Sequence, residues 1–272
     1  MTAPTIPTLK TGGALGSDAH WIKVARRHRL NIEVYSFNGH RVFSSEVDDK
    51  ELKVLTGEQL REAESHLEKA NETLGRKYPT SSKVSNNLLR RNYFIVKGVQ
   101  AVFACCRFET NGKIAKGGTG WGLQMAIDAN IPAYAFDMDS QQWKVYRNDA
   151  RTFVKCPEKK MPKLPAVFAG IGARFSCETG KDAIEKLFKR TYGEFYVWPP
   201  ASLASAYSFP VSYLSAGARE VSKRAKVTTV IVAEEEVGPT TRNQVDCEKE
   251  KKSENSDTPA ASSTTVGVPL KS

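Results

Sequence analysis

Short apolar runs alternate with longer amphipathic segments along most of this chain. Residues 31–37 (NIEVYSF) place apolar side chains at a period of two, which is typical of a β-strand. Residues 101–105 and 133–136 are apolar almost throughout, as in strands that are covered on both faces. Because helical segments separate these runs, the pattern predicts an α/β domain with a parallel sheet.

The helical segments have apolar residues at spacings of three and four. The longest is predicted to begin after Thr56, which caps its first turn, and to end at Gly75. Other helices are expected at residues 17–28, 82–97, 122–130 and 180–192.

The remaining segments of the predicted sheet are less regular. The chain before Thr11 has two prolines and few apolar residues, so the first strand is expected to be short, irregular or missing. Residues 165–175 (PAVFAGIGARF) predict a further strand that closes the sheet. Trp143 and Tyr146 are interpreted as anchors of an edge hairpin, with an aromatic wall over a ligand ring as the alternative.

The chain is predicted to have three parts. Residues 1–195 form the α/β domain, and residues 196–232 form an aromatic, proline-rich appendage that packs on it. Residues 233–272 are charged, rich in serine and threonine and nearly free of aromatic residues. This last part cannot bury enough apolar area to offset the cost of ordering the chain, so we expect a disordered tail.

The formal net charge of +10 is unevenly distributed, because the tail is net acidic and the rest of the chain is correspondingly more basic. A basic surface attracts phosphate-bearing partners, from nucleotides to RNA. The lysines and arginines are scattered in short clusters, however, which favours a generally basic solvated surface over a dedicated nucleic-acid face.

The five cysteines have no metal-ligand spacing, so no metal is expected, and we expect no cofactor. No apolar run approaches the length of a membrane span, and no secretory leader precedes the first glycine-rich segment, so no membrane association is expected. The expected location is intracellular, in the cytoplasm by default. Mitochondrial import is left open, because the first 30 residues are basic and contain one acidic residue.

The first of two glycine-rich segments is TGGALGSDAHW, which begins at Thr11 and leads into the helix at 17–28. Its glycines are Gly12, Gly13 and Gly16. They precede two residues whose side chains can cap the helix, Ser17 and Asp18.

The second glycine-rich segment begins at Lys116 and reads KGGTGWGLQMAID. Gly117, Gly118 and Gly120 remove three Cβ atoms within four residues, so the backbone can turn tightly and approach a ligand closely. We expect a loop here, followed by a helix that begins at Gly122.

A glycine loop before a helix directs several N–H groups to one point beside the positive end of the helix dipole, which suits a phosphate. Both loops are expected at the carboxyl edge of the parallel strands, where such sheets bind ligands. Arg90 and Arg91 precede the second loop by one strand, and a guanidinium there can reach the same crevice. The alternatives are structural glycine turns without a ligand and an exposed arginine pair.

Three segments together resemble the SLOG superfamily, a Rossmann-like group that includes the Smf/DprA DNA-processing proteins and the LOG cytokinin-activating phosphoribohydrolases. They are TGGALGSDAHW, RRNYFIVKGVQAVFACC, and KGGTGWGLQMAID with IPAYAFD, and they extend roughly over residues 9–192. The resemblance implies a Rossmann-like open, mostly parallel sheet with helices on both faces. It also implies a nucleotide or nucleotide-derived ligand beneath the two glycine-rich segments.

The second segment departs from the PGGxGTxxE motif of LOG-type enzymes, whose glutamate belongs to the catalytic machinery. Lys116 replaces the proline, Trp121 replaces the threonine, and Gln124 stands in place of the glutamate. Glutamine cannot transfer a proton near neutral pH, although it can hydrogen-bond a ribose or a base. The phosphoribohydrolase activity is therefore not carried over to this chain, and no catalytic residue is assigned.

Whether the protein is an enzyme is left open. An enzyme would be expected to hydrolyse an N-glycosidic or phosphate-ester bond of a nucleotide. Asp18 is the carboxylate best placed by sequence for catalysis, with a helix cap as the alternative role. N-glycosidic cleavage would need a carboxylate near Gln124 from another element, such as Glu109 or Asp137.

The first functional hypothesis is a nucleotide-binding protein that acts as a sensor or as a hydrolase of unspecified kind. The second is a basic nucleic-acid-binding or assembly subunit that retains the fold without catalysis, and a homo-oligomer is left open. The residues expected to contact the ligand are Gly12, Gly13, Gly16, Ser17, Asp18, Arg91, Gly117, Gly118, Thr119, Gly120 and Gln124.

Overall fold

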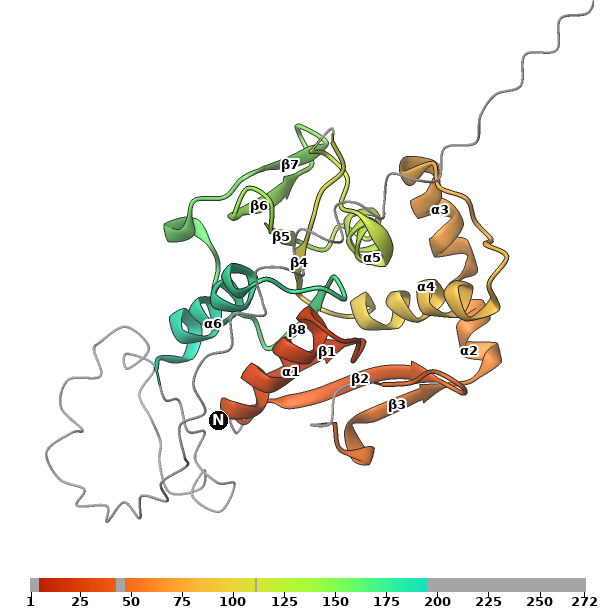
Figure 1. The fold of residues 1–272 in the computed structure, drawn as a ribbon, viewed down its shortest axis with the longest axis horizontal. Helices are drawn as coiled ribbons and strands as arrows, with labels where there is room; N and C mark the ends of the chain where they lie inside the picture. The colour runs from red at the N-terminus through yellow and green to blue at the C-terminus, as the bar shows by residue number, and fades with distance from the viewer. Residues whose placement is uncertain (1–4, 43–46, 111, 195–272) are drawn as a thin grey trace, which may run out of the picture. The chain divides into compact units, whose positions relative to one another are not determined.

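Among the described residues, eight strands pair in one sheet, in the order β3-β2-β1-β8-β4-β5-β6-β7 (Figure 1). The computed structural model describes residues 5–42, 47–110 and 112–194, so the appendage and tail predicted at 196–232 and 233–272 lie outside the described residues. Neighbouring strands from β3 to β5 are parallel, whereas β6 and β7 run antiparallel at one edge. The strands are β1 (Thr8–Thr11), β2 (Asn31–Phe37), β3 (Leu52–Leu55), β4 (Ala101–Cys106), β5 (Ala133–Asp137), β6 (Gln142–Arg147), β7 (Thr152–Lys155) and β8 (Val167–Gly172).

Helices cover both faces of this sheet. Along β4, Phe103 and Cys105 pack into the core beneath α1 and α6, whereas Val102 and Ala104 pack beneath α3, α4 and α5. The predicted open, mostly parallel sheet with helices on both faces is therefore confirmed. The helices are α1 (Ser17–Arg27), α2 (Gly57–Glu62), α3 (Glu64–Leu74), α4 (Lys83–Val96), α5 (Gly117–Asp128) and α6 (Glu178–Tyr192), with short 3-10 helices at Asp49–Glu51 and Glu158–Lys160.

The strand β8 lies in the middle of the sheet, hydrogen-bonded to β1 on one side and to β4 on the other. The prediction that this segment closes the sheet is therefore wrong. Gly170 explains part of the arrangement, because a Cβ there would lie 2.6 Å from a ring carbon of Trp21 and 2.8 Å from Leu9 Cδ1. The missing side chain lets Trp21 of α1 lie directly on the strand, where its Nε1 donates to the Ile171 carbonyl at 3.3 Å.

Two helices differ from their predicted bounds. The helix predicted between Thr56 and Gly75 has the predicted ends, because the Thr56 side chain accepts from the Gln59 N–H at 3.2 Å and Gly75 is left-handed with φ 59°. It is interrupted at Ala63, which separates α2 from α3. The helix predicted from Gly122 begins five residues earlier, at Gly117, so the expected glycine loop is the first turn of α5.

The edge hairpin expected around Trp143 and Tyr146 is present as β6 and β7. The first strand is short, with four residues in β1.

The direction of strand addition reverses in the centre of the sheet. From β1 the chain adds β2 and β3 on one side, and from β4 it adds β5, β6 and β7 on the other. The connections β1–α1 and β4–α5 therefore leave the carboxyl ends of strands that flank β8. Open α/β sheets bind ligands at such a reversal, so this edge is the expected place for a site.

Candidate functional site

The turn between β1 and α1 packs so closely on its surroundings that its glycines have no room for side chains. A Cβ on Gly12 would overlap the guanidinium of Arg91, and a Cβ on Gly16 would overlap the Arg174 carbonyl. Gly13 has φ 67°, and a Cβ there would lie 2.7 Å from Val34 Cγ1. The structure therefore gives each glycine a packing role in this turn.

The sequence suggested that Ser17 or Asp18 caps α1, but neither side chain does so. The N-cap residue is Gly16, which has no capping side chain. Ser17 instead fixes the start of α1 to the neighbouring strand ends: its N–H donates to the Ala173 carbonyl at 3.1 Å, and its hydroxyl donates to the Cys105 carbonyl at 3.3 Å.

Asp18 and Arg91 form the buried polar centre beneath this turn, with 4% and 5% of their surfaces exposed. One carboxylate oxygen of Asp18 accepts from the Ala14 N–H at 3.3 Å. Burial raises the pKa of Asp18 to about 6, although the positive charge of Arg91 and backbone N–H donors oppose this increase. Burial likewise lowers the pKa of Arg91, against the attraction of Asp18.

Several polar atoms at this centre lack partners within the described part of the chain. They are Oγ1 of Thr11, Oδ1 of Asp18 and Nε of Arg91. Most buried polar atoms in proteins are hydrogen-bonded, so a cluster of unpaired ones calls for a water or a ligand.

Two further basic side chains influence the electrostatics of the same centre. Burial lowers the pKa of His40 to about 4, and the charges of Arg91 and Arg174 act in the same direction. His40 Nδ1 lies 3.0 Å from the Ser36 hydroxyl at the end of β2. His40 is therefore neutral near pH 7, and the positive charge at this centre comes from Arg91 in α4 and Arg174 after β8, an arrangement suited to an anion.

The second glycine-rich segment presents its first two residues on the surface and turns the next two inward. Gly117 and Gly118 are exposed, whereas Thr119 and Gly120 are buried. Gly117 has φ 63° and needs to be glycine, and a Cβ on Gly120 would overlap the Ala115 carbonyl. Gly118 is different, because a Cβ there would contact only Asn92 Nδ2, at 3.9 Å.

Arg76 holds the connection that leads into α5, and the sequence pattern did not single it out. Its guanidinium donates to the carbonyls of Gly117 and Ala115 at 2.9 and 2.7 Å and to Glu109 Oε1 at 2.7 Å. Glu109, one of the carboxylates considered for catalysis, is therefore engaged in a structural ion pair.

The helix α4 connects the two glycine-rich segments through consecutive residues. Arg91 lies against Gly12, and the next residue, Asn92, donates from Nδ2 to the Gly118 carbonyl at 3.0 Å. The structure thus brings both segments to the same helix, at the carboxyl edge of the sheet.

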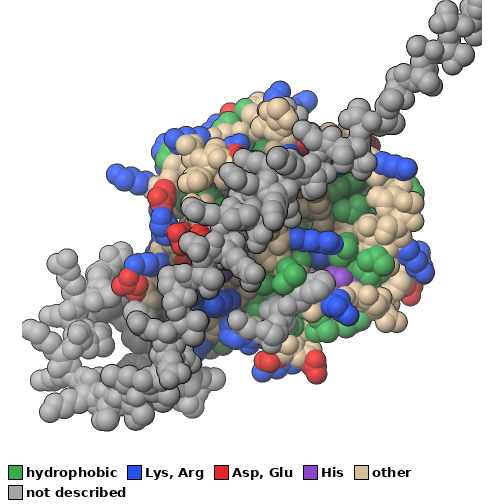
Figure 2. Space-filling view, in the orientation of Figure 1, with side chains coloured by type: hydrophobic (Ala, Val, Ile, Leu, Met, Phe, Trp, Pro, Cys, Tyr) green, Lys and Arg blue, Asp and Glu red, His purple; other side chains and the backbone are tan. Residues whose placement is uncertain are grey.

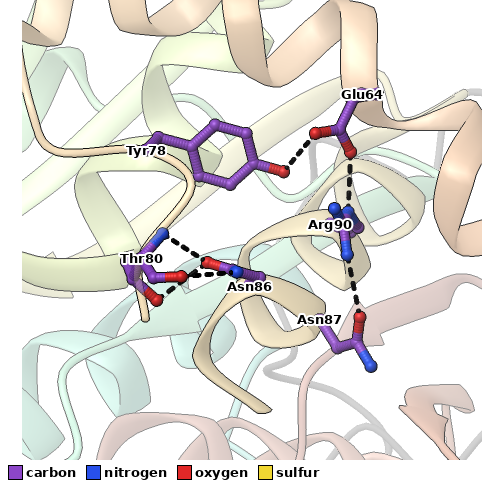
Figure 3. A network of polar contacts seen from close by, with 6 residues as sticks. All are labelled: Glu64, Tyr78, Thr80, Asn86, Asn87 and Arg90. Atoms are coloured by element: carbon purple, nitrogen blue, oxygen red, sulfur yellow. Dashed lines mark hydrogen bonds and ion pairs between the residues drawn. The ribbon is translucent and has the colours of Figure 1, made fainter. Parts of the chain in front are cut away.

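Arg90 has a structural role in orienting α4 (Figure 3). Its Nε donates to Glu64 Oε2 at 2.7 Å, and the Tyr78 hydroxyl donates to the other oxygen of this carboxylate at 2.9 Å. Hydrogen bonds from Arg90 hold the pKa of Glu64 below its usual range. Arg90 therefore ties α4 to the start of α3, while Arg91 faces the Gly12 turn.

Gln124 is not part of the Arg91 centre. Its amide donates to Asp128 Oδ1 at 2.8 Å, one turn further along α5. Burial raises the pKa of Asp128, and the charges of Lys69 and Glu72 in α3 also act on it, so this pair lies on the side of α5 that faces α3. Asp137, the other candidate carboxylate, is paired with Lys144 Nζ at 2.9 Å and accepts from the Ser140 hydroxyl at 2.7 Å.

Lysine and arginine side chains on the visible face lie around the domain and among acidic ones (Figure 2). Many arginines are paired with carboxylates, including Arg27, Arg76 and Arg147. In the described ranges, no three His, Cys, Asp or Glu side chains are grouped as a metal site would require. None of the helices in those ranges has the length and apolar character needed to span a membrane.

The fold and the polar centre define this part of the chain as a doubly wound α/β domain whose strand order reverses beside a buried Asp–Arg pair. Comparisons with protein-family models, with curated proteins and with solved structures found no match.

Proposed function

We propose that the protein binds a nucleotide or a nucleotide-derived ligand at the carboxyl edge of β1 and β4. The observation that carries the proposal is the buried Arg91–Asp18 pair beneath Gly12, in which Nε of Arg91 and Oδ1 of Asp18 have no hydrogen-bond partner in the described part of the chain. A buried guanidinium without its full set of partners is a strong anion-binding group, since it can donate two parallel hydrogen bonds to a phosphate.

The two glycine-rich segments take different parts in this proposal. Arg91, with Arg174 nearby, supplies the positive potential for the phosphate. The first turn of α5 supplies exposed backbone at Gly117 and Gly118, and helix N-termini offer unpaired N–H groups to an anion. Asp18 accepts a hydrogen bond from a hydroxyl of the sugar at its Oδ1, which has no partner in the described part of the chain.

The test is the binding of nucleoside monophosphates, dinucleotides and ADP-ribose to the full chain, measured by thermal shift and calorimetry. A ligand at a hundredfold excess over its Kd adds about 2.7 kcal/mol of stability, which gives a clear rise in Tm. No rise with any of these ligands, in a protein that unfolds cooperatively, would contradict the proposal.

Gly118 offers a matched pair of variants, because its position is exposed and has room for a side chain. Gly118→Glu and Gly118→Gln add nearly the same volume, and they differ in a negative charge at the start of α5. We expect the glutamate variant to bind the ligand at least tenfold more weakly than the glutamine variant, with similar Tm values in the absence of ligand. Equal affinity in the two variants would remove α5 from the site.

The same variants test the second hypothesis, a nucleic-acid-binding subunit. Binding of RNA or DNA that falls steeply with salt and is equal in the two Gly118 variants would favour that function, because backbone phosphates are held by scattered surface charge.

A further inference from the structure

Two cysteines from distant parts of the chain meet at the first turn of α6. Cys177 is the N-cap residue of α6, and Cys105 is the penultimate residue of β4. A Cβ on Gly180 would lie 2.6 Å from Cys105 Sγ and 3.5 Å from Cys177 Sγ. Both sulfur atoms therefore face the same side of Gly180 and lie within about 6 Å of each other.

The two thiols differ in their access to solvent. Cys105 is fully buried, whereas Cys177 is partly exposed, with its Sγ 3.1 Å from the Thr179 hydroxyl. Burial raises the pKa of Cys105 to about 12, so this residue stays a neutral thiol. A small oxidant from solvent therefore meets Cys177 first and finds a second thiol directly behind it.

Metal binding does not account for this pair. The described residues contain no group of three His, Cys, Asp or Glu side chains that could hold an ion, and two thiols alone do not complete a tetrahedral site. Thiol oxidation needs only the two sulfur atoms and an oxidant.

We propose that Cys177 and Cys105 form an oxidative modification site, in which a hydroperoxide joins them through a disulfide. The Cys177 thiolate attacks one peroxide oxygen and breaks the O–O bond, which gives a sulfenic acid and hydroxide. The Cys105 thiol then passes its proton to the sulfenic oxygen as its sulfur attacks the Cys177 sulfur, so that the S–O bond breaks, water leaves and the S–S bond forms. In total, two thiols are oxidised by two electrons and one hydrogen peroxide is reduced to two waters.

The bond would act on backbone that supports the Gly12 turn. The Cys105 carbonyl accepts from the Ala173 N–H at 2.9 Å and from the Ser17 hydroxyl at 3.3 Å. A disulfide would thus fix the start of α6 to the strand end on which α1 also rests. The inference is independent of the proposed ligand, because it depends only on the positions of the two sulfur atoms.

The test is peptide mapping of the native full-length protein after treatment with hydrogen peroxide, alkylation of free thiols and trypsin digestion without reductant. The expected product is a linked pair of peptides, residues 98–107 (GVQAVFACCR) and 175–181 (FSCETGK). The link should persist in Cys106→Ser, Cys156→Ser and Cys247→Ser, and it should be lost in Cys105→Ser and Cys177→Ser.

Gly180→Ala retains both thiols and places a methyl group where the sulfur atoms face each other. It should form the link at least tenfold more slowly than the wild-type protein, while Cys177 is still oxidised at its usual rate. The proposal is overturned if wild-type Cys177 proceeds to sulfinic acid without the link. A link in Cys105→Ser, made through Cys106 or Cys247, would overturn it as well.

Discussion

The guanidinium of Arg91 occupies the position that a side chain on Gly12 would take. This relationship joins a residue of α4 to the turn after β1, and it places a buried cation beside Asp18. The absence of a side chain at Gly12 therefore leaves room for the Arg91 guanidinium as well as for the tight turn.

Gly12→Ala is expected to lower the free energy of unfolding by about 1–3 kcal/mol, the usual cost of adding a methyl group to a closely packed site. It should also weaken ligand binding, because Arg91 has to move. Gly57→Ala is the matched control: the new Cβ would contact only Arg61 Nη1, at 3.9 Å, at the first position of α2. This control should be neutral or stabilising by up to about 1 kcal/mol. Urea unfolding measures the stability of both variants. An equal loss of stability in Gly12→Ala and Gly57→Ala would contradict the packing argument.

Asp18 is expected to make the protein less stable as the pH rises through about 6. Its pKa is raised from 3.8 to about 6 in the folded protein, so the folded state keeps the proton after the unfolded state has lost it. The stabilising contribution is fully present below about pH 4 and is lost as the pH rises through 6, a change of roughly 3 kcal/mol. His40 acts in the opposite sense, because burial lowers its pKa to about 4.

Asp18→Asn isolates the contribution of this carboxyl from that of His40. The stability of the variant relative to wild type should rise by up to roughly 3 kcal/mol between pH 4 and pH 7, measured by urea unfolding at each pH. A difference that stays constant with pH would show that Asp18 titrates normally.

Arg76→Gln is expected to loosen the connection between β4 and α5, because Arg76 donates to two carbonyls and one carboxylate there. Hydrogen exchange should become faster at residues 112–120 and stay unchanged in β1, β4 and β8. Arg147→Gln is the control, since its pair with Asp149 is exposed and such surface pairs contribute little to stability. Unchanged exchange in Arg76→Gln would show that the connection is held by other contacts.

Glu64→Gln is expected to destabilise the domain by about 1 kcal/mol, since the ion pair with Arg90 is only partly buried. The loss should grow at low salt. It should diminish only as the pH falls below 4.5 and through the folded-state pKa of Glu64, which Arg90 holds below its usual range. Thermal unfolding of the variant and the wild type at two salt concentrations and several pH values measures this loss. A destabilisation that does not diminish at low pH would assign the effect to packing instead.

Local patterns predicted the elements that depend on neighbouring residues in the chain. The period of two in β2, the cap at Thr56 and the left-handed Gly75 are local features, and each was recovered from the sequence. The start of α5 was missed because glycine has a low helix propensity. It is stabilised from outside the segment, by Arg76 and Asn92. Tertiary contacts therefore decided the point at which α5 begins.

The candidate site depended still more on contacts between distant segments. The sequence indicated Asp18 and Arg91 as separate candidates, but their meeting beneath Gly12 requires α4 to pack against β1. Glu64 and Tyr78, which fix α4 through Arg90, gave no signal in the sequence. The edge strand β3 was missed as well, because its four residues are partly exposed and follow an acidic turn.

The central position of β8 has a consequence for the order in which the chain can fold. β1 and β4 do not pair with each other, and each pairs with β8, more than 60 residues after β4 in the chain. While the protein is being synthesised, the first three strands and the hairpin side of the sheet are therefore separate, each with an uncovered edge, until residues 167–172 have left the ribosome. Such late, long-range closure is slow, and it exposes nascent chains to pairing with one another. Stalled chains that end before residue 167 should accordingly be cut by protease far faster than chains that extend past α6.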